Sequence, residues 1–178
     1  MQKTKNIKII IGLFYLILLF IFLYLFFSKF TLEEITTYKF IQANREYLAN
    51  IKQTNTILLL FAFLIFTIIW VLILGFASPI LLAAGFIFGK WLGVLLAVGS
   101  LSIGATILYI FAGYFFKDLI KEKFLNKFKN LETKFKKNEF IFFLIYRFVG
   151  GIPFQIANLL PILFNVKRKN YFFGSFLG

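Results

Sequence analysis

The 178-residue chain is 61% hydrophobic, carries 20 Lys and Arg against 7 Asp and Glu, and contains neither Cys nor His. Soluble domains are about half apolar and about a quarter charged, so lipid is the solvent for most of this chain. The lack of Cys and His excludes disulfides, the usual zinc sites and His-based acid–base catalysis; we therefore expect no metal, no cofactor and no enzyme.

The N-terminal segment predicts one transmembrane helix. Lysines precede an uncharged run from Ile9 to Phe27, close to the roughly 20 residues that cross a bilayer. A cleaved signal peptide is the alternative, but the run is longer than a usual signal core and no small-residue cleavage site follows before Lys29. Residues 28–55 are mixed and polar, which indicates an interfacial segment.

A second uncharged run, Ile57 to Ala77, predicts another span. Residues 76–93 then combine Ser78-Pro79 with glycines at four-residue intervals, Gly85, Gly89 and Gly93. An apolar, Pro-opened stretch too short to cross is typical of a re-entrant hairpin. The glycine spacing also fits ordinary close packing of membrane helices.

Leu92 to Phe116 is the third predicted span, rich in small residues. Residues 117–139 form a Lys-rich stretch with one apolar stripe, typical of a helix lying in the membrane interface. A solvated linker helix is the alternative. Basic charge placed between apolar spans favours anionic headgroups over nucleic acid as the partner.

Phe140 to Phe164 is apolar but carries several polar residues and helix breakers, which predicts a second broken hairpin. These are Arg147, Gly150, Gly151, Pro153, Gln155, Asn158 and Pro161. Two interrupted segments, 76–93 and 147–161, favour a transporter-type architecture, although kinked, closely packed helices would look similar. Tyr171 to Gly178 reads as the start of another helix, so we expect a last span beyond it.

Arg147 is the residue that most favours a function inside the membrane. A charge at the centre of a span costs roughly 2.5–3.5 kcal/mol on insertion scales and usually faces a partner or a cavity. No acid lies between Glu46 and Asp118, which leaves backbone carbonyls, Gln155, Asn158, water or a substrate anion as partners. Snorkelling of Arg147 to the interface is the alternative.

Several short segments of this chain resemble the VTT domain of the SNARE-associated Golgi protein family, within the DedA superfamily. The resemblance runs from about residue 57 to 178 and rests on Ser78-Pro79, residues 83–89, Gly104-Ala105, Tyr146-Arg147-Phe148, residues 152–158 and residues 172–178. It implies two re-entrant loops that face each other and a role in moving lipids between leaflets. The implied lipids are phospholipids in eukaryotic members and undecaprenyl phosphate in bacterial ones.

Carried onto this chain, the resemblance assigns Pro79, Gly85 and Gly89 to the first loop, and Arg147, Pro153 and Asn158 to the second. The first loop departs from the DedA branch because it has no acidic residue. The sequence therefore favours lipid movement without proton coupling over proton-coupled transport.

The sequence thus predicts an all-α integral membrane bundle with two re-entrant hairpins, multi-pass in a bacterial plasma membrane. Residues 1–56 would hold the first span and interfacial segment, and residues 57–178 the VTT domain. The expected function is movement of anionic lipids; a membrane scaffold acting through residues 117–139 is the alternative, and homo-oligomers remain open. The expected substrate-binding residues are Arg147, Gln155, Asn158 and Lys90, and the loop-shaping ones Pro79, Gly85, Gly89, Gly150, Gly151 and Pro153.

Overall fold

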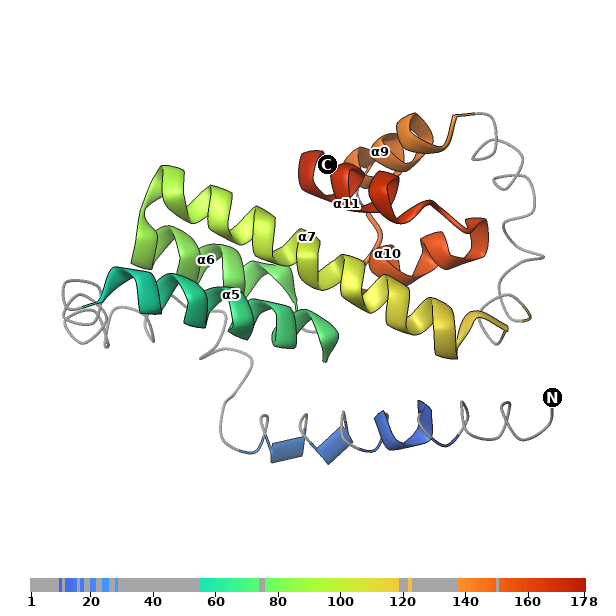
Figure 1. The fold of residues 1–178 in the computed structure, drawn as a ribbon, viewed down its shortest axis with the longest axis horizontal. Coiled ribbons are helices and arrows are strands. Elements are labelled where there is room, and N and C mark those ends of the chain that lie inside the picture. Colours follow the sequence, from blue (N-terminus) through green and yellow to red (C-terminus); the bar gives the residue numbers. More distant parts are fainter. Residues whose placement is uncertain are drawn as a thin grey trace. The chain divides into compact units, whose positions relative to one another are not determined.

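The computed structural model describes residues 55–73, 76–118, 138–149 and 151–178, residue 122 and isolated positions between 10 and 28. The described regular elements are all helical (Figure 1), which confirms the all-α class. They are α5 (Thr56–Leu72), α6 (Ala77–Phe88), α7 (Lys90–Phe115), α9 (Glu139–Val149), α10 (Phe154–Leu159), the 3-10 helix η1 (Leu160–Phe164) and α11 (Arg168–Leu177). Most of the first predicted span and of the basic stretch 117–139 lies outside the described residues.

Helix α7 is the one element of the described chain that is long and apolar enough to cross a bilayer. Its 26 residues rise about 39 Å, which exceeds a hydrocarbon core of about 30 Å. The predicted third span is one continuous helix, which begins two residues earlier than expected, at Lys90. Many of its side chains are exposed, as expected for a surface whose neighbour is lipid.

The second predicted span is shorter than expected. Helix α5 ends at Leu72 rather than Ala77, and its 17 residues rise only about 25 Å. The indole Nε1–H of Trp70 donates to the carbonyl of Phe76 at 2.8 Å, which fixes the chain in a bend after α5. Pro79 then lies in the first turn of α6, where a missing N–H is tolerated.

The chain divides into two compact units, and the first comprises residues 1–67 with 77–97. In it, α6 and the start of α7 form a helical hairpin that turns at Gly89, whose φ of 80° suits glycine. A Cβ on Gly93 would lie 2.5 Å from the carbonyl oxygen of Ala84, so the two backbones touch. Segment 76–93 is therefore helix, glycine and helix, and Gly85 lies inside α6 rather than in the bend.

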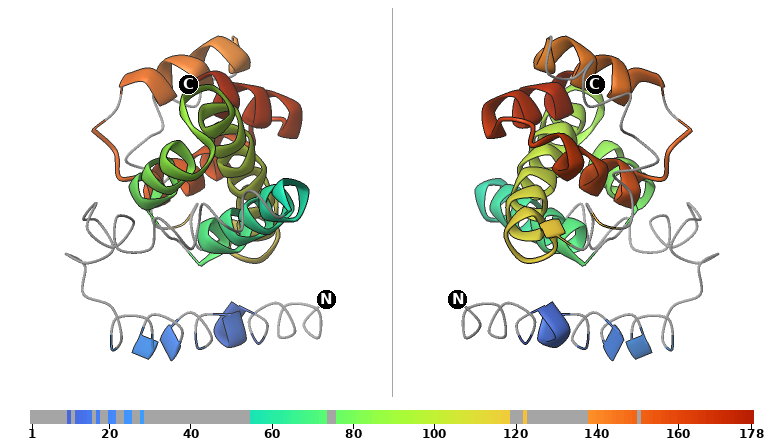
Figure 2. Two further views of the ribbon diagram at one scale, coloured as in Figure 1. Left: turned by 90° about the vertical axis from the view of Figure 1, so that its left-hand side faces the viewer. Right: turned by 90° about the vertical axis from the view of Figure 1, so that its right-hand side faces the viewer.

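The second unit comprises residues 68–76 with 98–178. Helices α9 and α11 lie side by side in it, as both views of Figure 2 agree. They run parallel, because Glu139 at the start of α9 bonds to Lys167 at the start of α11, and Arg147 at the end of α9 bonds to Ser175. The segment containing α10 and η1 connects the end of α9 to the start of α11. The predicted interruption after α9 is therefore confirmed.

The backbone contact at Gly93 gives a direct stability test. Gly93→Ala would place a methyl group against a backbone carbonyl, and overpacking of this kind costs about 1–3 kcal/mol. Gly99→Ala, on the same helix, has open space and should be neutral or slightly stabilising, because Ala is the better helix former. Unfolding in SDS titrations compares the two. Equal stability of both variants would contradict the close contact.

Candidate functional site

The guanidinium of Arg147 joins three elements of the second unit. Arg147 lies in the last turn of α9 and is half-buried. Its Nη2 donates to Asn158 Oδ1 on α10 at 2.9 Å, and to Ser175 Oγ and the Tyr171 hydroxyl on α11 at 2.7 and 3.2 Å. The guanidinium therefore faces the helices α10 and α11, which favours a partner in the bundle over snorkelling.

Buried aromatic rings hold this cluster in place. The guanidinium carbon lies 5.3 Å from the ring centre of Phe143, one turn earlier on α9, and 5.5 Å from that of Tyr171. Both rings are fully buried, and a cation over an aromatic face gains electrostatic energy when water is excluded. A Cβ on Gly174 would lie 2.5 Å from Phe143 Cδ1, so the glycine allows α11 to approach that ring.

Asn158 is the second centre of the cluster. Its side chain is fully buried, and its own carbonyl accepts the Tyr171 hydroxyl at 3.0 Å. One residue before it, the carbonyl of Ala157 accepts the Tyr146 hydroxyl at 3.1 Å. Hydroxyl groups from α9 and α11 thus hold the short helix α10, which is too short to be stable alone.

The cation is surrounded by neutral oxygens. In the described part of the chain no carboxylate contacts the guanidinium, and the carboxylate of Glu139 instead caps α11, accepting from Lys167 N at 2.5 Å and Asn170 Nδ2 at 2.8 Å. The buried Arg147 Nε and Asn158 Nδ2 have no partner among the described residues. Buried donors are normally paired, so these two are the unsatisfied hydrogen-bond donors of the cluster.

The structure brings together only part of the predicted site. Arg147 and Asn158 are in direct contact, whereas Gln155 lies in the first turn of α10 and no bond joins it to Arg147. Lys90 belongs to the first unit, where its Nζ lies 5.4 Å from the ring of Trp91. Its assignment to the same binding site stays a prediction.

The residues expected to shape the second loop lie between α9 and α10. Gly151 has a φ of 74°, a left-handed conformation that other residues adopt with strain. Pro153 precedes α10 with extended backbone angles, φ −52° and ψ 138°, so the chain turns here before the short helix. Gly150 lies outside the described residues.

Sequence reasoning missed Tyr171 and Ser175. Both lie on α11, four residues apart and therefore on one face of the helix. The signal was present, because a hydroxyl pair at helical spacing in an apolar segment predicts a shared polar partner. The eight-residue run 171–178 was interpreted only as the beginning of a further span.

The geometry defines an all-helical protein in which a cation is held among apolar helices. The family model for the VTT domain matches residues 76–178, and the chain belongs to this family of membrane proteins. A curated relative, "Uncharacterized protein YqeD" of Bacillus subtilis, is 28% identical over 96 residues, which are 53% of this chain and 46% of the relative. The chain thus spans about half the length of that relative, and no solved structure matches it.

The contact between Arg147 and Asn158 can be measured as a coupling free energy. A double-mutant cycle with Arg147→Met and Asn158→Ala should give a coupling of about 1.5–3 kcal/mol, because the hydrogen bond involves a charged group. SDS unfolding of the four proteins supplies the free energies. Additive effects, within about 0.5 kcal/mol, would show that the two side chains do not interact.

Proposed function

We propose that this VTT-domain protein lets anionic lipids move between the two leaflets, with Arg147 meeting the lipid phosphate during passage. The observation that carries the proposal is a half-buried guanidinium whose partners among the described residues are neutral. Arg is suited to phosphate because its planar fork donates two parallel hydrogen bonds to phosphate oxygens. Arg147 Nε belongs to that fork and, like the neighbouring Asn158 Nδ2, is buried without a partner among the described residues.

The path of the chain around Arg147 supports a re-entrant second hairpin. Helix α9 has 11 residues and rises only about 16 Å, half of the hydrocarbon thickness of about 30 Å. The chain then turns, and Lys167 comes back to the starting end of α9, where its N–H donates to Glu139. A segment that enters from Glu139 and leaves at Lys167 would carry Arg147 close to the membrane midplane.

The first hairpin fits the same proposal with less support. Helix α6 has 12 residues, about 18 Å, so it is too short to cross and turns back at Gly89. We propose that both hairpins re-enter the membrane and that the VTT domain begins near residue 57. The segment 76–93 has no acidic residue, which favours lipid movement without proton coupling and without enzymatic chemistry.

The proposed location is the plasma membrane of a bacterium. The relative in Bacillus subtilis supports a bacterial source, and the basic excess of 20 Lys and Arg over 7 acids suits a surface of anionic headgroups. Anionic lipids would then be both the surroundings and the cargo of the protein. The Arg147 cluster would act on the cargo.

Substitution of Arg147 tests the role of the guanidinium. Arg147→Gln should lower the rate of phosphatidylglycerol movement at least about tenfold, because each hydrogen bond to a charged group contributes about 1.5–3 kcal/mol. Arg147→Lys should be intermediate, since Lys keeps the charge but not the planar fork. The measurement is the loss of fluorescence of a headgroup-labelled lipid in proteoliposomes when a membrane-impermeant quencher is added.

Two controls separate lipid movement from folding and from general charge effects. Lys169→Gln removes an exposed cation next to the start of α11 and should leave the rate unchanged. Size-exclusion chromatography should show that the Arg147 variants remain folded. Arg147→Gln protein that moves lipid at the wild-type rate, or wild-type protein that moves none, would contradict the proposal and favour a scaffold role.

A further inference from the structure

A second feature of the same unit lies outside the Arg147 cluster. The last turns of α7 and the connection between η1 and α11 enclose an open groove of about 720 Å³. Ile107, Ile110 and Phe111 line its α7 wall, and Ile162 and Val166 line the opposite wall. None of Arg147, Asn158, Tyr171 and Ser175 lines it, so it requires an explanation of its own.

Direct contacts hold the two walls of the groove together. The Tyr109 hydroxyl on α7 donates to the carbonyl of Val166 at 2.6 Å. The Tyr109 ring also stacks on Tyr171 of α11, with 4.3 Å between ring centres. Asn165 turns the chain in the left-handed conformation, φ 50°, at the end of η1. A groove fixed in this way does not have to be ordered by its ligand, which favours binding.

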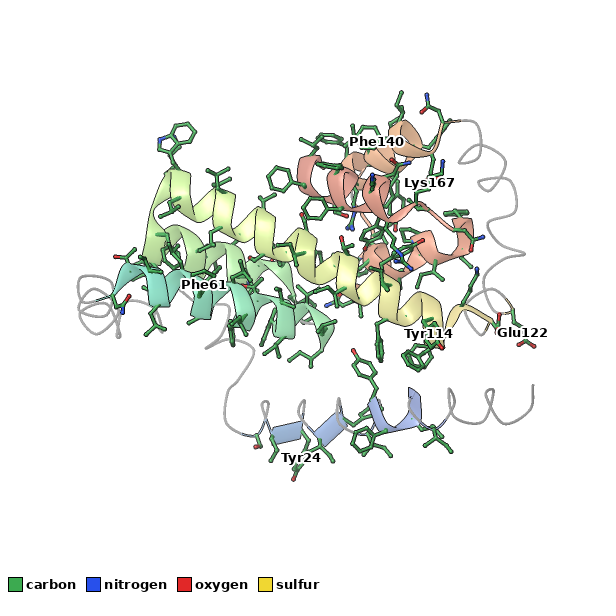
Figure 3. All side chains as sticks on the ribbon, viewed as in Figure 1. Tyr24, Phe61, Tyr114, Glu122, Phe140 and Lys167 are labelled. Carbon is green, nitrogen blue, oxygen red and sulfur yellow. The ribbon has the colours of Figure 1, made fainter. Side chains whose placement is uncertain are left out.

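Three basic residues line the groove. Lys117 contributes from the end of α7, and Lys167 and Arg168 contribute from the connection into α11, together with the exposed ring of Tyr114. Figure 3 labels Tyr114 and Lys167, which lie apart on the two walls. The nearby acids do not line it, because the Glu139 carboxylate caps α11 and Asp118 lies beyond Lys117 in the sequence. Three cations among apolar side chains make an amphiphilic site.

The position of the groove along α7 identifies the kind of ligand that would fit. Helix α7 is long and apolar enough to cross the membrane, which would put Lys117, just after its end at Phe115, at the headgroup level. From Ile107 to Lys117 the helix rises about 15 Å, the depth of one leaflet of a hydrocarbon core about 30 Å thick. The groove therefore matches a lipid with an anionic headgroup at the surface and a chain extending inward.

We propose that this groove binds one resident anionic phospholipid, with its phosphate among Lys117, Lys167 and Arg168 and one acyl chain along α7. The bound lipid would be a fixed ligand rather than cargo. It would fill the space between α7 and the η1–α11 connection and tie the basic start of α11 to the membrane surface. The inference rests on the membrane location of the protein and not on lipid movement.

Charge removal tests the headgroup end of the groove. Lys117→Gln/Arg168→Gln should weaken binding of phosphatidylglycerol by about fivefold or more, because each cation near a membrane surface contributes about that factor. A matched pair of single variants supplies the control: Arg168→Gln should weaken binding, whereas Lys169→Gln, at the next and exposed position of α11, should not, because Lys169 does not line the groove. Native mass spectrometry of delipidated protein, titrated with phosphatidylglycerol or phosphatidylcholine, counts the bound lipids.

Gly113 offers an independent test of the space inside the groove. It lines the groove, and a Cβ at this position meets no atom within 4 Å, so Gly113→Leu should fill the space without disturbing the fold. Gly99→Leu introduces the same side chain on the same helix, also into open space but outside the groove. Gly113→Leu should weaken phosphatidylglycerol binding severalfold, whereas Gly99→Leu should not.

The outcomes distinguish the occupants of the groove. Selective loss of phosphatidylglycerol binding in both groove variants supports a resident lipid, whether or not lipid movement is retained. Glycerol phosphate that binds as tightly as the lipid would point to a soluble anion and overturn the proposal. Loss of a dimer instead of a lipid would assign the groove to a second copy, and unchanged binding in both variants would leave no lipid site there.

Discussion

The charge of Arg147 among apolar helices is the constraint on which the second unit depends. A guanidinium cannot be left without hydrogen bonds in a low-dielectric environment, so α9 must keep its last turn next to α10 and α11. The hydrogen-bond acceptors come from Asn158 on α10 and from Tyr171 and Ser175 on α11. These acceptors are neutral oxygens, which satisfy hydrogen bonds without neutralising the charge, and the proposed lipid phosphate would supply the missing anion.

Glycine placement sets how closely the helices pack within each unit. Gly93 allows backbone contact in one unit, and Gly174 and Gly104 allow side chains of neighbouring helices to approach in the other. Apolar helices in lipid gain nothing from burying more hydrocarbon, so their association relies on such close approach and on polar contacts. For α9 and α11, the close contact at Gly174 and the Arg147 hydrogen bonds are complementary means of holding the same pair of helices.

The sequence predicted the helical class and the long apolar helix α7, and it named Asn158 as one of several possible partners of Arg147. These followed from local signals: an uncharged run of sufficient length, and a charge close to an amide in an apolar segment. The end of α5 at Leu72 was missed because the run stays apolar through Ala77, and the bend depends on a bond from the indole of Trp70. Tyr171 and Ser175 were missed because only the tertiary structure brings α11 beside α9.

The parallel arrangement of α9 and α11 has an electrostatic consequence. Their dipoles point the same way, so two partly positive ends meet at Glu139 and two partly negative ends meet at Arg147. One acid and one base therefore stabilise both helices at once. The helix ends also reduce the positive potential that an arriving phosphate would meet, so the proposed binding of phosphate at Arg147 would be weak. Weak binding suits passage, because a site that binds its cargo weakly can also release it.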